Sequence, residues 1–146
     1  MDLQGFLPYR LSVASELVSR ALAALYAERF SLTRDEWRVI AHLAGVRDIK
    51  ATELGARTSL AKMSISRAVT RLERDGLIAR ESDPEDRRNL VVRLLPPGRA
   101  LYRKIEPMAL ARETFLLDGL SAVERAAFDR ALAKIEARAR QLLEQG

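Results

Sequence analysis

The sequence contains no cysteine and only one histidine, His42, among its 146 residues. The lack of cysteine excludes disulfides, thiolate metal sites, cysteine nucleophiles and cysteine-based redox sensing. The chain also has no G-x-G-x-x-G, Walker or H-E-x-x-H motif, so few groups remain for acid–base or metal chemistry. We therefore expect a protein that is not an enzyme and that uses neither a metal nor a cofactor.

Long apolar runs are missing as well. No segment reaches the roughly 18 apolar residues that a transmembrane helix needs. The start of the chain, Met1 to Gly5, lacks the basic segment and apolar run that are typical of a secretion signal. The sequence thus predicts a protein of the cytoplasm with no membrane partner.

Lysine is scarce: of the 25 cationic residues, 4 are lysine and 21 are arginine. Codon usage in a GC-rich genome can produce such an excess, so the position of the charges is more informative than their type. Ten cations and six acids lie between Arg57 and Arg99, which gives this segment four of the five net positive charges. Such a concentration of positive charge is typical of a nucleic-acid-binding surface.

Apolar periodicity and capping signals predict helices over most of the chain. Apolar residues recur at helical spacing from Tyr9 to Phe30, and a capping box at Thr33 and Glu36 begins a second helix that runs to about Leu43. Two short helices, Ala51 to Thr58 and Lys62 to Asp75, follow with a tight turn between them. This pair has the arrangement of a helix-turn-helix.

After Gly76 the apolar period becomes that of β-strands. Segments beginning at Ile78 and ending at Leu94 read as a hairpin, with turn residues from Asp83 to Asp86 at its charged tip. Pro96 or Pro97 can begin a further helix, and a second capping box at Ser121 begins the last one.

These elements predict a mainly α (α+β) protein with two parts. Residues 31–95 form a winged helix-turn-helix with a two-stranded β wing, and residues 1–30 and 96–146 form N- and C-terminal helices. The apolar stripes of the terminal helices lie outside a compact winged helix and need a partner. We expect a second copy of the chain to supply it, so that these helices form the dimerisation region of a homodimer. Packing of the terminal helices against one another in a monomer is the alternative.

The helix from Lys62 has two different faces when successive residues are placed about 100° apart. Ile65, Ala68, Val69 and Leu72 share the face expected to be buried. The other face and its flanks carry hydroxyls and cations, which suit phosphates and base edges. A solvated surface would mix the signs of charge more, although Met63 could also fill a gap in the core. The predicted DNA-binding residues of this helix are Lys62, Ser64, Ser66, Arg67, Thr70, Arg71 and Arg74.

Two arginines, Arg87 and Arg88, lie just beyond the turn of the hairpin. A ribbon beside a recognition helix can reach the neighbouring minor groove, where arginine is favoured. The carboxylate of Asp86 could support Arg88 by a charge-assisted bond to its guanidinium. The alternative is an ordinary charged β-turn.

The residues from Lys62 to Arg80 resemble the recognition helix and first wing strand of the MarR family of winged-helix regulators. Asp83 to Arg88 resembles the wing signature of that family, with its Asp-x-Arg at Asp86 and Arg88. The order of the elements is similar over nearly the whole chain. The resemblance implies a homodimer, a palindromic site on double-stranded DNA, Arg88 in the minor groove and Asp86 as its support.

The resemblance also implies that a small aromatic acid or similar organic ligand often relieves repression. A pocket for it would lie where the terminal helices meet the DNA-binding part, near Arg10, Trp37 and Arg38, although Trp37 and His42 also suit purely structural roles. The predicted function is that of a sequence-specific transcriptional regulator, with repression favoured over activation. The alternative is a winged helix that contacts protein or RNA and binds no operator.

Overall fold

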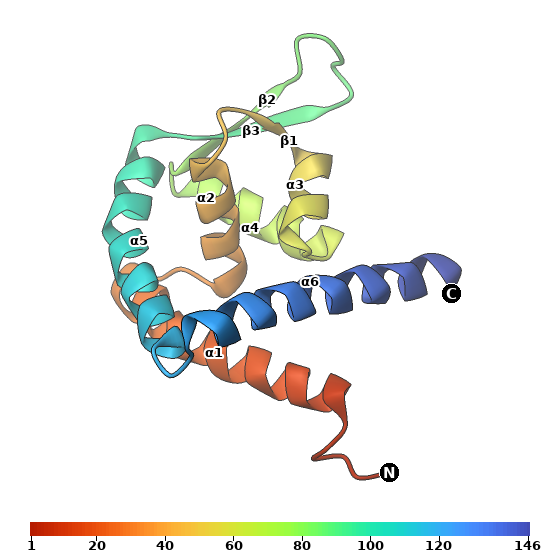
Figure 1. Cartoon of the computed structure of the whole chain (residues 1–146). Coiled ribbons are helices and arrows are strands. Elements are labelled where there is room, and N and C mark those ends of the chain that lie inside the picture. The colour runs from red at the N-terminus through yellow and green to blue at the C-terminus, as the bar shows by residue number, and fades with distance from the viewer. The chain divides into compact units, whose positions relative to one another are not determined.

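The computed structural model describes all 146 residues and contains six helices and a three-stranded sheet (Figure 1). The expected class, a mainly α winged helix-turn-helix, is confirmed. The chain divides into two compact units, Met1–Ala109 and Leu110–Gly146. None of the helices combines the length and the apolar content that a bilayer crossing requires.

The first unit contains α1 (Leu7–Phe30), α2 (Arg34–Ala44), β1 (Ile49–Lys50), α3 (Ala51–Thr58), α4 (Lys62–Arg74), β2 (Ile78–Ser82), β3 (Leu90–Leu94) and most of α5 (Pro96–Leu117). Helix α2 lies at the centre of this unit, because Val39, Ile40 and Leu43 are all completely buried. Each neighbouring element contributes to the same core; the contributors include Leu54, Leu72, Val92 and Ile105. Burial of these apolar side chains is the main source of stability for the unit.

The corner between α1 and α2 is defined by local hydrogen bonds. Ser31 ends α1 in the left-handed conformation, with φ of 54°. The predicted capping box is confirmed, because the Thr33 hydroxyl accepts a hydrogen bond from the Glu36 N–H and the Glu36 carboxylate accepts one from the Thr33 N–H, both at 3.1 Å. The direction in which α2 leaves α1 is therefore set within a few residues.

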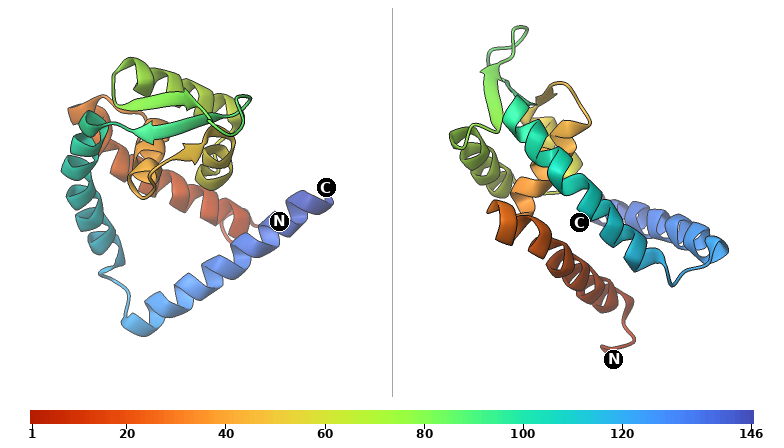
Figure 2. Two further views of the ribbon diagram at one scale, coloured as in Figure 1. Left: turned by 90° about the horizontal axis from the view of Figure 1, so that it is seen from above. Right: turned by 90° about the vertical axis from the view of Figure 1, so that its left-hand side faces the viewer.

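The sheet has one strand more than the sequence predicts. β2 and β3 form the expected antiparallel hairpin, and β1 adds to the other edge of β3, with Ile49 opposite Val92 (Figure 2). β1 contains only two residues, too few to display the alternation by which a strand is recognised in a sequence. The loop between β2 and β3 projects away from the helices of the unit (Figure 1).

The second unit consists of the end of α5 and α6 (Ala122–Gln145). The second predicted capping box is also confirmed: Ser121 and Glu124 exchange two hydrogen bonds of 3.1 Å. Helix α6 has no buried residue within the chain.

Candidate nucleic-acid interface

Helix α4 presents its two faces as the sequence predicts. Ile65, Ala68, Val69 and Leu72 are buried against the rest of the first unit. Met63 is 65% exposed and therefore does not fill a gap in the core. The outer surface of the helix is polar and cationic; Lys62, Ser66, Arg67, Thr70 and Arg74 are exposed there, and Ser64 is half-buried at its edge.

The three arginines of α4 differ in what they contact within the chain. Arg67 is exposed and has no hydrogen bond or ion pair. Arg74 approaches only its neighbour Asp75, with Nε 3.4 Å from Oδ1, and its side chain is 71% exposed. Arg71, by contrast, pairs with Glu36 and donates to the carbonyl of Ser31, both at 3.3 Å. The structure thus leaves Arg67 and Arg74 available to an external partner and holds Arg71 against the protein.

The wing tip is organised by Asp86, although through other atoms than expected. Its Oδ1 accepts a hydrogen bond from the backbone N–H of Arg88 at 3.1 Å, and its Oδ2 accepts one from the amide of Asn89 at 3.3 Å. The carboxylate therefore stabilises the conformation of the turn and does not pair with the guanidinium of Arg88. Arg87 and Arg88 are both exposed on the loop between β2 and β3.

Two acidic residues connect the wing to its neighbouring elements, a role that the sequence does not predict for either of them. Asp83 is 8% exposed; its carboxylate accepts from the Glu85 N–H and lies 3.9 Å from the ammonium of Lys50 in β1. Glu73 of α4 pairs with Arg80 of β2 at 2.9 Å. Glu73 appears in the sequence only as an acid within a basic segment. Asp83 appears as a turn residue, and its partner Lys50 belongs to the strand that the sequence does not reveal.

The residues predicted for a ligand pocket are not brought together into one cavity. Trp37 is half-buried and stacks with both Tyr26 and Tyr102, with ring centroids 6.0 and 5.8 Å away. Arg38 is exposed. Arg10 lines a cavity of about 260 Å³ along the start of α1, which neither of the other two residues lines.

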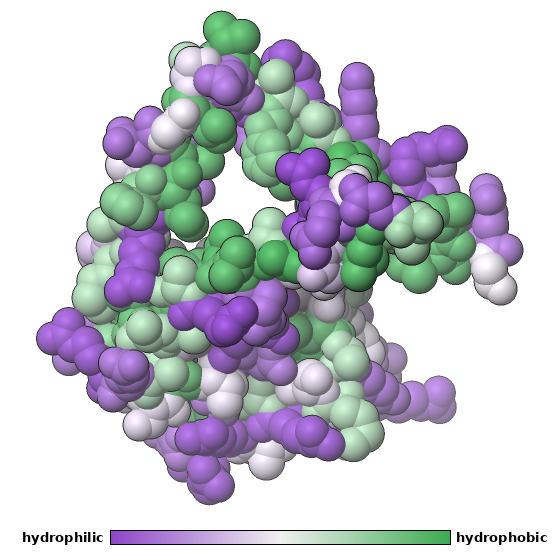
Figure 3. All heavy atoms as spheres, turned by 90° about the horizontal axis from the view of Figure 1, so that it is seen from below, coloured by the Kyte–Doolittle hydropathy of each residue, from purple (hydrophilic) through white to green (hydrophobic).

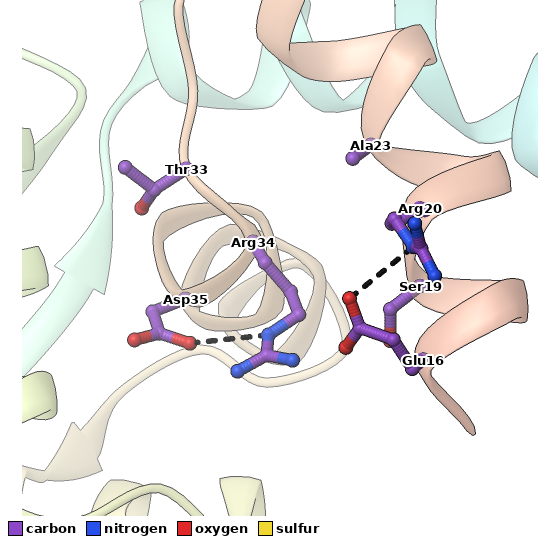
Figure 4. Close-up of a pocket in the computed structure, with 7 residues that line it drawn as sticks. All are labelled: Glu16, Ser19, Arg20, Ala23, Thr33, Arg34 and Asp35. Carbon is purple, nitrogen blue, oxygen red and sulfur yellow. Dashed lines mark ion pairs between the residues drawn. The ribbon is translucent and has the colours of Figure 1, made fainter. Parts of the chain in front are cut away.

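A different cavity, of about 300 Å³, lies between α1 and the start of α2 (Figure 4). Arg20 and Arg34 approach it from the two helices. Each arginine is paired with an acid of its own helix, Glu16 at 3.3 Å and Asp35 at 3.6 Å respectively. The chain contains no group of three or more side chains that could together ligate a metal ion.

Comparison with known proteins places this arrangement in a family. The family model described as the MarR family matches residues 30–89, which run from the end of α1 to the wing tip. A crystal structure of a MarR-family regulator from Silicibacter pomeroyi superposes with a TM-score of 0.80 at 29% identity and covers 93% of this chain and 91% of that one. The winged helix-turn-helix of this chain, within residues 30–89, is that of the MarR family.

Individual relatives of this chain are named as repressors. The homoprotocatechuate degradative operon repressor of Escherichia coli is 33% identical over 79 residues, which are 54% of this chain and 53% of the repressor. The alignment thus spans about half the length of that relative. An HTH-type transcriptional repressor of Mycobacterium bovis is 29% identical over 132 residues, 90% of this chain and 91% of the relative.

One similar structure was solved with nucleic acid. A MarR-family regulator from Streptomyces coelicolor, in complex with DNA, has a TM-score of 0.82 at 21% identity and covers 89% of this chain and 84% of that one. At this identity the likeness concerns the fold.

Proposed function

We propose that this protein is a sequence-specific DNA-binding transcriptional regulator, with repression favoured over activation. It acts on a palindromic operator as a homodimer and catalyses no reaction. The observation that carries the proposal is the exposed basic face of α4, in which Arg67 has no partner inside the chain. Arginine without an internal partner is free to bind guanine or phosphate. The exposed Arg87 and Arg88 at the wing tip supply a second contact point, suited to a minor groove.

Within this proposal the DNA-binding residues divide into two groups. Lys62, Ser64, Ser66, Arg67, Thr70 and Arg74 read or position the major groove, while Arg87 and Arg88 act at the minor groove. Asp86 supports the wing by holding the backbone of Arg88.

The terminal helices support the homodimer. Large apolar side chains are exposed on α1 and in the second unit, and green apolar side chains reach the surface on the face that Figure 3 shows. They include Leu7 and Leu17 of α1, Phe115 of α5, and Val123, Leu142 and Leu143 of α6. A second copy of the chain would cover these side chains, since large apolar patches mark protein–protein interfaces. A two-fold dimer would place two copies of α4 about one duplex turn, ~34 Å, apart.

Release of DNA by a small organic ligand is the remaining part of the proposal. Because Trp37 already stacks with two tyrosines, the cavity between α1 and α2 in Figure 4 is a better candidate than the surface of Trp37. It lies where a terminal helix meets the first helix of the DNA-binding part, as expected for a pocket that senses both. Adding benzoate, a simple aromatic acid, to the DNA-binding assay below would reveal release.

The test begins with selection of bound duplexes from a random library by the purified chain. We expect the logarithm of the affinity for the selected duplex to fall linearly with the logarithm of the salt concentration, by about 0.9 per phosphate contact. Arg67→Ala and Arg88→Ala should each weaken binding by roughly tenfold or more, the scale of one specific contact. Arg103→Ala, which removes an exposed arginine from α5, is the matched control and should bind like the parent.

The alternative function predicts a different result. A winged helix that contacts protein or RNA would enrich no duplex, or would bind all duplexes equally. If Arg88→Ala bound the selected duplex as the parent does, the role of the wing would be wrong even though DNA binding itself held.

A further inference from the structure

A buried carboxylate lies between the α1–α2 corner and helix α4. The side chain of Glu36 is only 4% exposed, and a buried carboxylate is stable only where its oxygens are paired. Its Oε2 accepts a hydrogen bond from the backbone N–H of Thr33 at 3.1 Å. Its Oε1 lies 3.3 Å from Nη1 of Arg71. The cationic partner that compensates Glu36 therefore comes from the helix that is proposed to read DNA.

Arg71 is held at a second point, by the end of α1. Its Nη2 donates to the backbone carbonyl of Ser31, the left-handed residue that ends that helix, at 3.3 Å. Both terminal nitrogens of the guanidinium are thus engaged inside the chain. A bidentate contact to guanine would need two nitrogens of the same fork. A contact to guanine that uses these two nitrogens would therefore compete with the pairing to Glu36.

Arg67, one turn earlier on α4, provides the comparison. Both arginines line the same small cavity between α2 and α4, of about 270 Å³. Arg67 has no partner in the chain, whereas Arg71 has two. The two arginines therefore share a location and a charge but differ in whether the chain itself binds them.

We propose that Arg71 is a positioning residue that, with Glu36 and Ser31, forms a clamp between α4 and the α1–α2 corner. This Arg71 clamp sets the orientation in which α4 presents Arg67 and its hydroxyls to DNA. It also connects α4 to α1, a helix expected in the dimer, so it transmits the placement of the dimer helices to the reading face. The inference rests on the proposed DNA-binding function and specifies the role of one residue within it.

Glu36→Gln tests the clamp with little disturbance to the fold. Glutamine can replace glutamate in a capping box, so the hydrogen bond to Thr33 is retained while the charge that pairs with Arg71 is lost. Arg71→Gln removes the other partner, and the double variant completes a thermodynamic cycle. Arg71→Lys keeps the charge but not the fork, and should recover only part of the loss. Circular dichroism at the assay temperature verifies that each variant is folded.

We expect Glu36→Gln and Arg71→Gln each to weaken binding of the selected duplex by roughly tenfold, within the range of coupled pairs. The double variant should bind no more weakly than the weaker single one. All three should keep the parent's salt slope, because no phosphate contact is lost. Arg67→Gln should behave differently, because it removes a contact to DNA itself: its effect should concentrate on particular base pairs.

Two results would overturn the clamp: normal binding by Glu36→Gln, or additive effects of Glu36→Gln and Arg71→Gln. Either result would mean that Arg71 does not act on DNA binding through Glu36. Thermal unfolding of the parent, the two single variants and the double variant without DNA measures the same coupling independently. Additive effects on the free energy of unfolding would also overturn the clamp. If the parent chain selected no duplex, the proposed function would be refuted. The coupling between Arg71 and Glu36 in the unfolding measurements would still decide whether these residues hold α2 and α4 together.

Discussion

Glu73 is an acidic residue on a helix whose outer surface is otherwise cationic, and its contacts explain its presence there. Its carboxylate accepts hydrogen bonds from the backbone N–H, Nε and Nη2 of Arg80 at 3.2, 3.3 and 2.9 Å. The hydrogen bonds from the Arg80 side chain, aided by its charge, lower the pKa of Glu73 below its ordinary value. The same pairing raises the pKa of Arg80, which therefore stays charged throughout the accessible pH range. The pair joins α4 to the first wing strand.

This pair predicts a pH-dependent contribution to stability. Because the pKa of Glu73 is lower in the folded than in the unfolded chain, the pair stabilises the fold above the ordinary carboxylate pKa, and this stabilisation is lost as the pH falls through the lowered folded value. Glu73→Gln should reduce the free energy of unfolding near pH 7 by less than about 1 kcal/mol, because both side chains are partly exposed. Urea unfolding should show the difference from the parent disappearing in acid.

Arg80→Gln supplies the matched background for this measurement. In that variant Glu73→Gln should have little further effect at any pH, because the carboxylate has already lost its partner. An equally large effect of Glu73→Gln with and without Arg80, or an effect that persists unchanged in acid, would contradict the pairing.

At the level of single residues, the sequence predicted which side chains of α4 face outward but not which of them are already bound. The helical period alone places Arg67 and Arg71 on one surface. Glu36, the partner of Arg71, lies 35 residues earlier in the chain, and only the packing of α2 on α4 brings the two together. Likewise, Asp86 was identified as the support of the wing, but its bonds to backbone and amide groups depend on the conformation of the turn.

Among the elements, α5 begins in unusually close contact with the wing. The backbone N–H of Leu95 donates to the carbonyl of Leu77 at 2.9 Å. A Cβ atom on Gly98 would lie 2.3 Å from that same carbonyl oxygen and 2.6 Å from a methyl group of Leu94. The first turn of α5 can therefore approach the start of the hairpin only because residue 98 has no side chain.

Gly98→Ala should consequently be destabilising. Relief of the overlap requires the first turn of α5 to move away from a backbone group, for which we expect a loss of about 1–3 kcal/mol in the free energy of unfolding. Gly119→Ala is the control, because a Cβ there would meet no atom within 4 Å. Urea unfolding of both variants provides the measurement, and equal stabilities would mean that the close approach to Leu77 is absent in solution.

The sequence identified the elements well wherever a local signal marks them. Both capping boxes begin helices where they were expected, at Thr33 and Ser121, since the hydrogen bonds involved span only three residues. β3 was recognised by its alternation and occupies Leu90–Leu94. β1 was missed because two residues become a strand only through their pairing with β3.

At the scale of the whole molecule, the second unit has apolar side chains that nothing in the chain covers. Phe115, Val123 and Leu143 are 81%, 78% and 84% exposed, and α6 buries no residue within the chain. An amphipathic helix with no covered face gains little stability from packing in a monomer. We infer that a second copy covers it.

Deleting residues 121–146, which removes α6, should therefore convert the dimer to a monomer. Sedimentation velocity measures the change, and circular dichroism verifies that the remaining helices persist. Val123→Asp and Leu143→Asp in the full chain should weaken association in the same direction, because a charge in an apolar interface is costly to desolvate. A truncated chain that sediments as a dimer would place the interface elsewhere.

The sequence by itself determined the order of the elements, the class of the fold, the two faces of α4 and the exposed arginines of the wing. All of these follow from periodicity, capping and turn chemistry, which act over a few residues. The tertiary structure alone decided that Arg71 is held by Glu36, that Glu73 binds Arg80, that Trp37 stacks with two tyrosines and that β1 completes the sheet. These features join residues distant in the chain, and no local pattern specifies such partners, because they are selected by the packing of the core.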